Sequence, residues 1–173
     1  MSDCCSTPQP SVAALTENAL CNECGEKGRS VPRLTVLHHV KSGNLPRVGD
    51  EEYMFCGTPT CPIVYFGASG KVFAISDVRE LISSKESGDA RPLCYCFGFT
   101  EGDARDEIAR TGGSIIPARI SRLTKEGMCA CEVRNPSGAC CLGLVNKTIK
   151  RLINENQSAA ESFIAPVHDC CSR

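Results

Sequence analysis

The placement of cysteine constrains this chain more than any other feature of its sequence. The 173 residues include 14 cysteines, and six of these fall in two groups separated by a cysteine-free stretch. The groups are Cys94 with Cys96, and Cys129, Cys131, Cys140 with Cys141. Two sulfide-bridged iron atoms take four thiolates, two on each iron. The grouping therefore predicts a [2Fe–2S] site assembled from two loops.

A [2Fe–2S] cluster takes only four of these six thiols as ligands. Cys94 and Cys96 supply one half of the site, since no other cysteine lies near them in sequence. Residues 135–138 (Asn-Pro-Ser-Gly) predict a tight turn, with Pro second and Gly fourth. Such a turn folds Cys131 back toward the 140–141 pair, and a helix expected directly after Cys141 offers free amides and a positive dipole end. We select Cys131 and Cys141; replacement of either by Cys129 or Cys140 stays open.

A second set of cysteine pairs precedes this region. Cys21 and Cys24 form a C-x-x-C followed by Gly, and Cys56 and Cys61 form a C-x4-C. Two such pairs at strand–turn junctions supply the four thiolates of a closed tetrahedral zinc site. A redox C-x-x-C would need a βαβ context, which the sequence does not show. Whether a histidine of the 38–39 pair joins this site stays open.

Composition favours two small modules over one large core. The chain has no Trp, 5% aromatic residues and a formal net charge of −1. Bound metal supplies folding free energy that a small core lacks. The charge argues against a nucleic-acid partner. No apolar run approaches the roughly 18–20 residues that span a bilayer, and the first residues do not resemble a secretory signal. We therefore expect a cytoplasmic protein, in which closely spaced cysteines bind metal rather than form disulfides.

The expected fold class is α+β, a small β-rich zinc module followed by a small helical [2Fe–2S] module. The zinc-binding domain is expected at 21–85, with strands at 34–38 and around 53–56, a hairpin joining 64–66 to 71–75, and a short helix at 78–82 capped by Asp77. A polar linker follows at 84–92. The [2Fe–2S] domain is expected at 92–153, with helices after a Thr100–Asp103 capping box, at 118–125 and at 142–153. Residues 1–20 and 154–173 are expected to be flexible tails that contain cysteine.

The order of these motifs resembles the N-terminal region of CopZ-type copper chaperones. The resemblance covers residues 21–153 and rests chiefly on C-E-V-x-N-P-S-G-x-C-C-L-G, which begins at Cys131. It implies a zinc-binding domain, a domain like the bacterioferritin-associated ferredoxins, and cytosolic copper handling with the cluster as a one-electron source for reducing Cu(II) to Cu(I). Full-length members carry a further domain with an M-x-C-x-x-C loop, and this sequence contains no such loop.

The remaining cysteines form adjacent pairs near the two ends of the sequence, Cys4 with Cys5 and Cys170 with Cys171. Adjacent thiols suit soft ions of low coordination number such as Cu(I) or Hg(II). We expect them to bind the cargo metal transiently, and the alternative of exposed thiols without a role stays open.

These observations favour an iron–sulfur and zinc metalloprotein of soft-metal homeostasis or resistance, with copper or mercury as cargo. Its expected partners are a metal transporter or a separate metallochaperone, and a redox partner. The alternative is a ferredoxin-like electron-transfer or docking module that serves a partner enzyme and has no copper role. No nucleophile–base pair is evident, so no catalytic residue is assigned and any enzymatic activity is at most metal-ion reduction.

Overall fold

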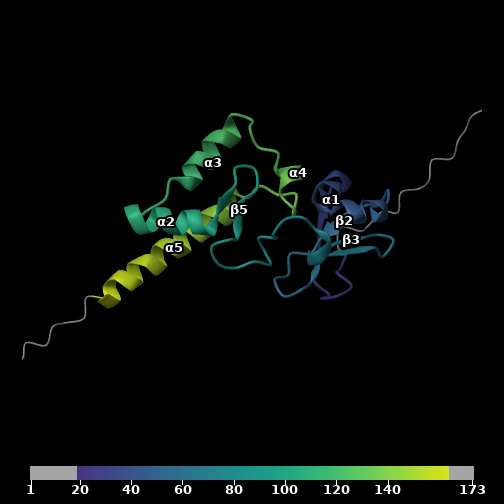
Figure 1. Cartoon of the computed structure of the whole chain (residues 1–173), viewed down its shortest axis with the longest axis horizontal. Coiled ribbons are helices and arrows are strands. Elements are labelled where there is room, and N and C mark those ends of the chain that lie inside the picture. Colours follow the sequence, from purple (N-terminus) through teal and green to yellow (C-terminus); the bar gives the residue numbers. More distant parts are fainter. Residues whose placement is uncertain (1–18, 164–173) are drawn as a thin grey trace, which may run out of the picture.

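The computed structural model describes residues 19–163 (Figure 1). Residues 19–91 contain a four-stranded sheet and are called the strand-containing half, and residues 92–163 contain most of the helices and are called the helical half. The α+β class expected from the sequence is confirmed, with an antiparallel sheet first and helices after it. The terminal pairs Cys4–Cys5 and Cys170–Cys171 lie outside the described residues.

The sheet has four antiparallel strands in the order β1 (Arg29–Val31), β2 (Tyr53–Phe55), β3 (Ile63–Gly67) and β4 (Val72–Ala74). All five residues of β3 are buried because two apolar clusters pack against the sheet. One cluster surrounds Tyr65 and Phe73, and the other places Phe66 beside the cysteines of the first metal-binding candidate. The expected hairpin between the third and fourth strands is present.

Residues 33–39 form a helix, so the strand expected at 34–38 is wrong. Helix α1 (Arg33–His39) buries Thr35, Val36 and His39, which share one face, and leaves Leu34 exposed. The β-branched residues that favour a strand locally are overridden by this packing. A 3-10 turn, η1 (Ser42–Arg47), follows.

The helix expected at 78–82 is also wrong. The chain instead makes a 3-10 turn, η2 (Ile75–Asp77), and Val78 forms an isolated bridge with Val40. Asp77 does act as a cap, but for the turn before it, since its Oδ2 accepts the Ala74 N–H at 3.0 Å.

The helical half begins with a two-stranded ribbon, β5 (Pro92–Cys94) and β6 (Phe99–Thr100). It continues through α2 (Glu101–Thr111), α3 (Ile116–Lys125), α4 (Cys131–Arg134) and α5 (Leu142–Phe163). Helices α2 and α3 pack on α5 around Ile108, Ile120 and Val145. The capping box of Thr100 and Asp103 is confirmed.

Helix α5 continues to Phe163, whereas the sequence predicted its end at Ile153. The apolar periodicity stops at Ile153, so nothing in that pattern marks the following turns as helical. No Gly or Pro interrupts 154–163, and an i,i+4 ion pair between Arg151 and Glu155 spans the expected end. The first part of the expected C-terminal tail is therefore helix.

The two halves meet where α1 packs against α4 (Figure 1). Thr35 Oγ1 donates to the Glu132 carbonyl at 2.5 Å, His39 Nε2 lies 3.0 Å from the Val133 carbonyl, and the Tyr65 hydroxyl donates to the Pro136 carbonyl at 2.9 Å. Three side chains of the strand-containing half therefore hold residues 132–136 of the helical half.

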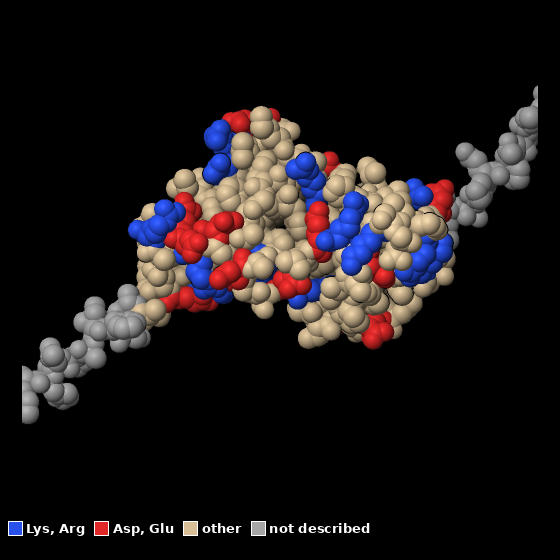
Figure 2. Space-filling model, viewed as in Figure 1, with Lys and Arg blue, Asp and Glu red and all other residues tan. Residues whose placement is uncertain are grey.

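Acidic and basic side chains are interspersed on the face shown in Figure 2. Ion pairs also join α2 to α5, such as that of Arg151 with the buried Glu101. Within the described residues, no helix is both long enough and apolar enough to cross a membrane.

Candidate metal centres

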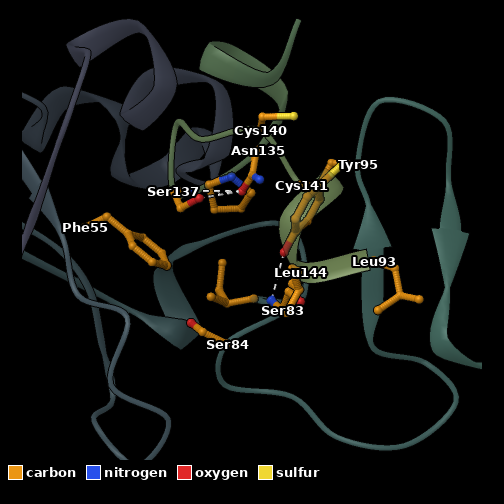
Figure 3. Close-up of a pocket in the computed structure, with 12 residues that line it drawn as sticks. Phe55, Ser83, Ser84, Leu93, Tyr95, Asn135, Ser137, Cys140, Cys141 and Leu144 are labelled. Atoms are coloured by element: carbon orange, nitrogen blue, oxygen red, sulfur yellow. Dashed lines mark hydrogen bonds between the residues drawn. The ribbon is translucent and has the colours of Figure 1, made fainter. Parts of the chain in front are cut away.

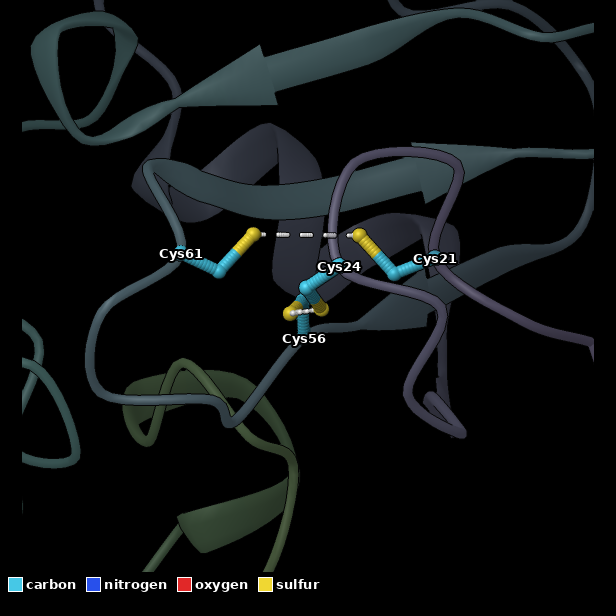
Figure 4. A group of neighbouring side chains, drawn as sticks. All are labelled: Cys21, Cys24, Cys56 and Cys61. Atoms are coloured by element: carbon cyan, nitrogen blue, oxygen red, sulfur yellow. Dashed lines mark hydrogen bonds between the residues drawn. The ribbon is translucent and has the colours of Figure 1, made fainter.

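Four cysteines of the strand-containing half form one compact group (Figure 4). Cys21 and Cys24 lie in the loop before β1, Cys56 directly follows β2, and Cys61 precedes β3. Their Sγ atoms all lie within 4.8 Å of one another. Cys24 and Cys56 are 3.6 Å apart and Cys21 and Cys61 are 3.9 Å apart. Thiolates on one tetrahedral zinc ion lie about 3.8 Å apart when each Zn–S bond is about 2.3 Å, so the spacing fits zinc.

The C-x-x-C loop folds around a glycine. Gly25 adopts φ 73°, a left-handed conformation that glycine tolerates best, and its N–H donates to the Cys21 carbonyl at 2.8 Å. The Cys21 N–H in turn donates to the Glu26 carbonyl at 2.9 Å. The loop therefore turns both of its sulfurs toward the second cysteine pair.

The four thiols differ in their electrostatic surroundings. The Thr58 hydroxyl, 3.4 Å from Cys24 Sγ, is the main group that lowers the pKa of Cys24 to about 6. Burial raises the pKa of Cys61 to about 12 and also raises that of Cys21. A bound cation would offset this burial cost, because metal binding requires the thiolate forms.

Lys85 braces the second cysteine pair from outside the group. Its Nζ donates to the carbonyls of Thr58 and Cys61, both at 2.8 Å. Four thiolates around one divalent zinc ion carry a net charge of −2, so an ammonium group beside them is favourable. The sequence places Lys85 at the start of a polar linker, and only the tertiary structure reveals this contact.

Neither His38 nor His39 belongs to the four-cysteine group. Both instead lie in a separate group with Glu80. His39 is buried against α4, and His38 is exposed. The described geometry therefore leaves the first group with sulfur donors only.

In the helical half, the four thiols selected from the sequence lie as two pairs. Cys96 and Cys131 Sγ are 3.7 Å apart. Cys94 and Cys141 belong to the same core cluster, and the hydrogen bond between their side chains is the largest influence on the pKa of each. Among the described residues these four do not form a compact group like the first. Two pairs suit two metal ions better than one, because each iron of a [2Fe–2S] cluster takes two thiolates.

The electrostatics of this second group favour one thiolate in particular. The hydrogen bond with Cys141 lowers the pKa of Cys94 to about 6, against the opposing effect of burial. The same interaction raises the pKa of Cys141. Burial raises the pKa of Cys131 to about 12, and Cys96 contributes in the same direction.

Local structure explains how these sulfurs converge. Asn135 and Gly138 close the expected turn, with the Gly138 N–H donating to the Asn135 carbonyl at 2.8 Å and Gly138 at φ 65°. Asn135 also holds the Ala139 carbonyl through Nδ2 at 2.7 Å. Cys131 opens α4, and Cys141 directly precedes α5, where its carbonyl accepts the Val145 N–H at 3.0 Å. Cys141 thus stands at the positive end of the α5 dipole.

The two thiols left open by the sequence differ in exposure. Cys129 is partly buried and Cys140 is exposed. A cavity of about 120 Å³ lies beside Cys140 and Cys141 and is lined from both halves, with Phe55 on one side and the Asn135–Ser137 turn on another (Figure 3).

Comparison with known proteins gives a consistent result. Residues 18–79 match the zf_CopZ family model, described as a zinc binding domain, and all four cysteines of the first group fall inside the match. The chain is 35% identical over 121 residues to the copper chaperone CopZ of Archaeoglobus fulgidus. That alignment covers 70% of this chain and 57% of the chaperone, so the chain spans little more than half the length of that relative.

Structure comparison extends the match into the helical half. The X-ray structure of the Archaeoglobus fulgidus CopZ N-terminal domain superimposes with a TM-score of 0.60 at 29% identity, covering 75% of this chain and 96% of that domain. The chain is therefore similar to CopZ in both sequence and structure. Both halves of the chain are therefore covered by one known architecture, and residues 18–79 match a model of a zinc binding domain.

Some residues of the candidate centres could not be found from sequence. Thr58 lies between two selected cysteines, and its position in C-x4-C is the one signal that could have indicated its role. Lys85 has no such signal. Arg134, whose Nη1 donates to the Cys96 carbonyl at 3.1 Å, lies within the long motif but carries no metal-ligand chemistry of its own.

Proposed function

We propose that this chain is a copper-handling metalloprotein with a structural zinc site and a redox-active [2Fe–2S] site. Cys21, Cys24, Cys56 and Cys61 hold zinc, and Cys94, Cys96, Cys131 and Cys141 hold the cluster. The relation to CopZ supports the copper role, and the geometry of the thiols supports the assignment of the two centres.

One observation carries the cluster assignment, namely that the thiols of the helical half are arranged as two pairs. The 3.7 Å between the Cys96 and Cys131 sulfurs is close to the spacing of two ligands on one tetrahedral ion, about 3.8 Å. Cys94 and Cys141 form the second pair. When bound, a [2Fe–2S] cluster supplies one electron at a time.

The chain's own groups are suited to stabilise negative charge at this centre. The Ala130 N–H donates to Cys96 Sγ at 3.5 Å. Amides of Phe97 and Cys96 hydrogen-bond to the Cys94 sulfur and help to lower its pKa. Hydrogen bonds to cluster sulfurs and partial burial are among the factors that set a cluster's reduction potential.

Elemental analysis tests the two resident centres. Protein purified without oxygen should contain about two iron, two acid-labile sulfide and one zinc per chain, with visible absorption that bleaches on reduction and an EPR signal from one unpaired electron. A colourless protein without sulfide would contradict the cluster assignment. A protein with iron but no zinc would contradict the assignment of the first group.

A Cu(I) titration tests the copper role. Anaerobic protein should compete with a Cu(I) chelator. A variant that combines Cys4→Ser, Cys5→Ser, Cys170→Ser and Cys171→Ser should bind Cu(I) at least about tenfold more weakly, because soft thiolates select Cu(I). Cys140→Ser is the control for an exposed thiol elsewhere. Unchanged affinity in the fourfold variant would exclude the terminal pairs. Complete absence of Cu(I) binding would instead favour the electron-transfer module.

A further inference from the structure

A second donor group lies at the end of α1, and neither candidate centre uses it. A ring nitrogen of His38, a ring nitrogen of His39 and a carboxylate oxygen of Glu80 lie within 4.8 Å of one another. His38 and His39 end α1, and Glu80 follows the η2 turn. Imidazole and carboxylate donors together suit divalent transition metals better than soft Cu(I).

The decisive atom is His39 Nδ1. His39 is 1% exposed, and its Nε2 lies 3.0 Å from the Val133 carbonyl. A carbonyl oxygen can only accept a hydrogen bond, so the proton of the neutral ring must be on Nε2. Nδ1 then carries a lone pair, and this buried atom has no hydrogen-bond partner in the described structure.

That lone pair faces another acceptor. Glu80 Oε2 is 3.5 Å from His39 Nδ1. Burial is the main cause that lowers the pKa of His39 to about 4, with the neighbouring His38 second, so the ring is neutral near pH 7. Two electron-rich atoms therefore face each other at neutral pH without a proton between them. A cation placed between them would satisfy both.

We propose that His38, His39 and Glu80 bind a divalent transition-metal ion such as Zn(II). Ligands about 2.0–2.1 Å from a tetrahedral ion lie about 3.3 Å from each other, close to the 3.5 Å between His39 and Glu80. The exposed His38 ring can rotate to complete the set. The Nε2–H···O=C bond fixes the orientation of His39, as second partners do for ligating histidines.

The position of this site links it to the helical half. The carbonyl that orients His39 belongs to Val133 of α4, the short helix that Cys131 opens. His38 and Glu80 are exposed, so three protein ligands leave a coordination position open to water. Such a site exchanges its ion more readily than a closed four-cysteine site.

Zinc is the probe of choice, since Zn(II) has no redox chemistry with thiols. The full chain would be used with its resident centres loaded and with Ser at positions 4, 5, 170 and 171, which removes competing terminal thiols. Zinc bound after dialysis against a zinc–chelator buffer is measured, together with the ¹⁵N shifts of the histidine rings. We expect one zinc more than the four-cysteine group accounts for, and a large shift of His39 Nδ1.

Variants locate the site. Glu80→Gln and His38→Gln change exposed side chains, so the fold should persist, and each should weaken the additional zinc at least about tenfold. Glu126→Gln, which alters an exposed carboxylate directly after α3 that is paired with Arg122, is the matched control and should bind like the parent. Equal zinc affinity in all three variants, or a His39 Nδ1 shift that zinc leaves unchanged, would overturn the proposal. Neither result would bear on the cluster or on copper binding.

Discussion

The hydroxyl of Tyr65 donates a hydrogen bond to the carbonyl oxygen of Pro136 at 2.9 Å, joining two residues 71 positions apart in sequence. Tyr65 is fully buried in the core of the sheet. Pro136 lies in the turn between Cys131 and Cys141. The core of the strand-containing half therefore fixes the loop that carries half of the proposed cluster ligands.

Removing this hydroxyl should loosen the loop. Tyr65→Phe leaves the Pro136 carbonyl buried without its donor, which should cost about 1–3 kcal/mol of unfolding free energy. Thermal unfolding of the holoprotein measures the cost, and iron content after exposure to a chelator measures retention of the cluster. We expect both to fall.

Tyr53→Phe is the matched control for this substitution. Tyr53 is equally buried, but its hydroxyl accepts the Gly49 N–H and donates to Glu51, both within the strand-containing half. The Tyr53→Phe variant should therefore be less stable than the parent but should retain nearly the same amount of iron. Equal iron loss in the two variants would show that the Tyr65 contact has no specific effect on the loop.

The choice among the loop thiols is tested by paired substitutions. Cys131→Ser should abolish most of the visible absorption, since Cys131 is buried and faces Cys96 at 3.7 Å. Cys129→Ser should retain it. Absorption spectra and sulfide content of anaerobic preparations provide the measurement. If Cys129→Ser loses the absorption and Cys131→Ser retains it, the cluster ligand is Cys129 instead of Cys131.

The zinc centre should contribute strongly to folding. Cys56→Ser removes one of four clustered thiols, and the protein should lose its zinc and its cooperative unfolding, because structural zinc supplies about 10 kcal/mol or more in small domains. Cys140→Ser, at an exposed thiol, should keep both. Zinc content and calorimetry provide the measurement; a Cys56→Ser protein that keeps one zinc and its melting temperature would refute this role.

Glu101 is the buried carboxylate at the start of α2. Its side chain is 4% exposed and is paired with Arg91, Arg105 and Arg151 at 3.1, 2.9 and 2.6 Å. Glu101→Gln removes the buried negative charge that these three cations share and should cost about 3 kcal/mol at pH 7. Glu155→Gln, at a half-exposed carboxylate, should cost about 1 kcal/mol or less.

The effect of Glu101 should depend on pH in a defined direction. Burial alone would raise the pKa of Glu101, but hydrogen bonds from Arg151 and Arg91 outweigh it and hold the pKa below the ordinary value. The folded pKa lies below the unfolded value of about 4.3, so the stabilisation is complete above that pH and is lost as pH falls through the folded pKa. The difference in unfolding free energy between parent and Glu101→Gln should therefore shrink below about pH 4. A difference in unfolding free energy that stays constant with pH would contradict this prediction.

Sequence was informative where local chemistry determines the outcome. The Thr100–Asp103 capping box and the turn closed by Gly138 are local arrangements, and both are present as predicted. The four cysteines around Cys56 are also brought together, because paired short spacings limit the ways in which their sulfurs can converge. That they hold metal stays a prediction.

Sequence failed where tertiary packing decides. Residues 33–39 are β-branched enough to resemble a strand, yet they form a helix because Thr35 and His39 reach α4 across more than 90 residues. The role of Lys85 depends on a fold that brings its ammonium group to two carbonyls of the C-x4-C loop. A pattern within a short window contains neither piece of information.

The hydrogen bonds from Thr35, His39 and Tyr65 to residues 132–136 have a consequence for dissecting this protein. A fragment that starts in the polar segment 84–92 would contain all four thiols of the second centre but none of these three braces. Its loop would be free to sample conformations in which the sulfurs diverge. Truncation would thus make the loop that carries Cys131 and Cys141 less rigid, and the isolated fragment would incorporate an iron–sulfur cluster more slowly than the intact chain.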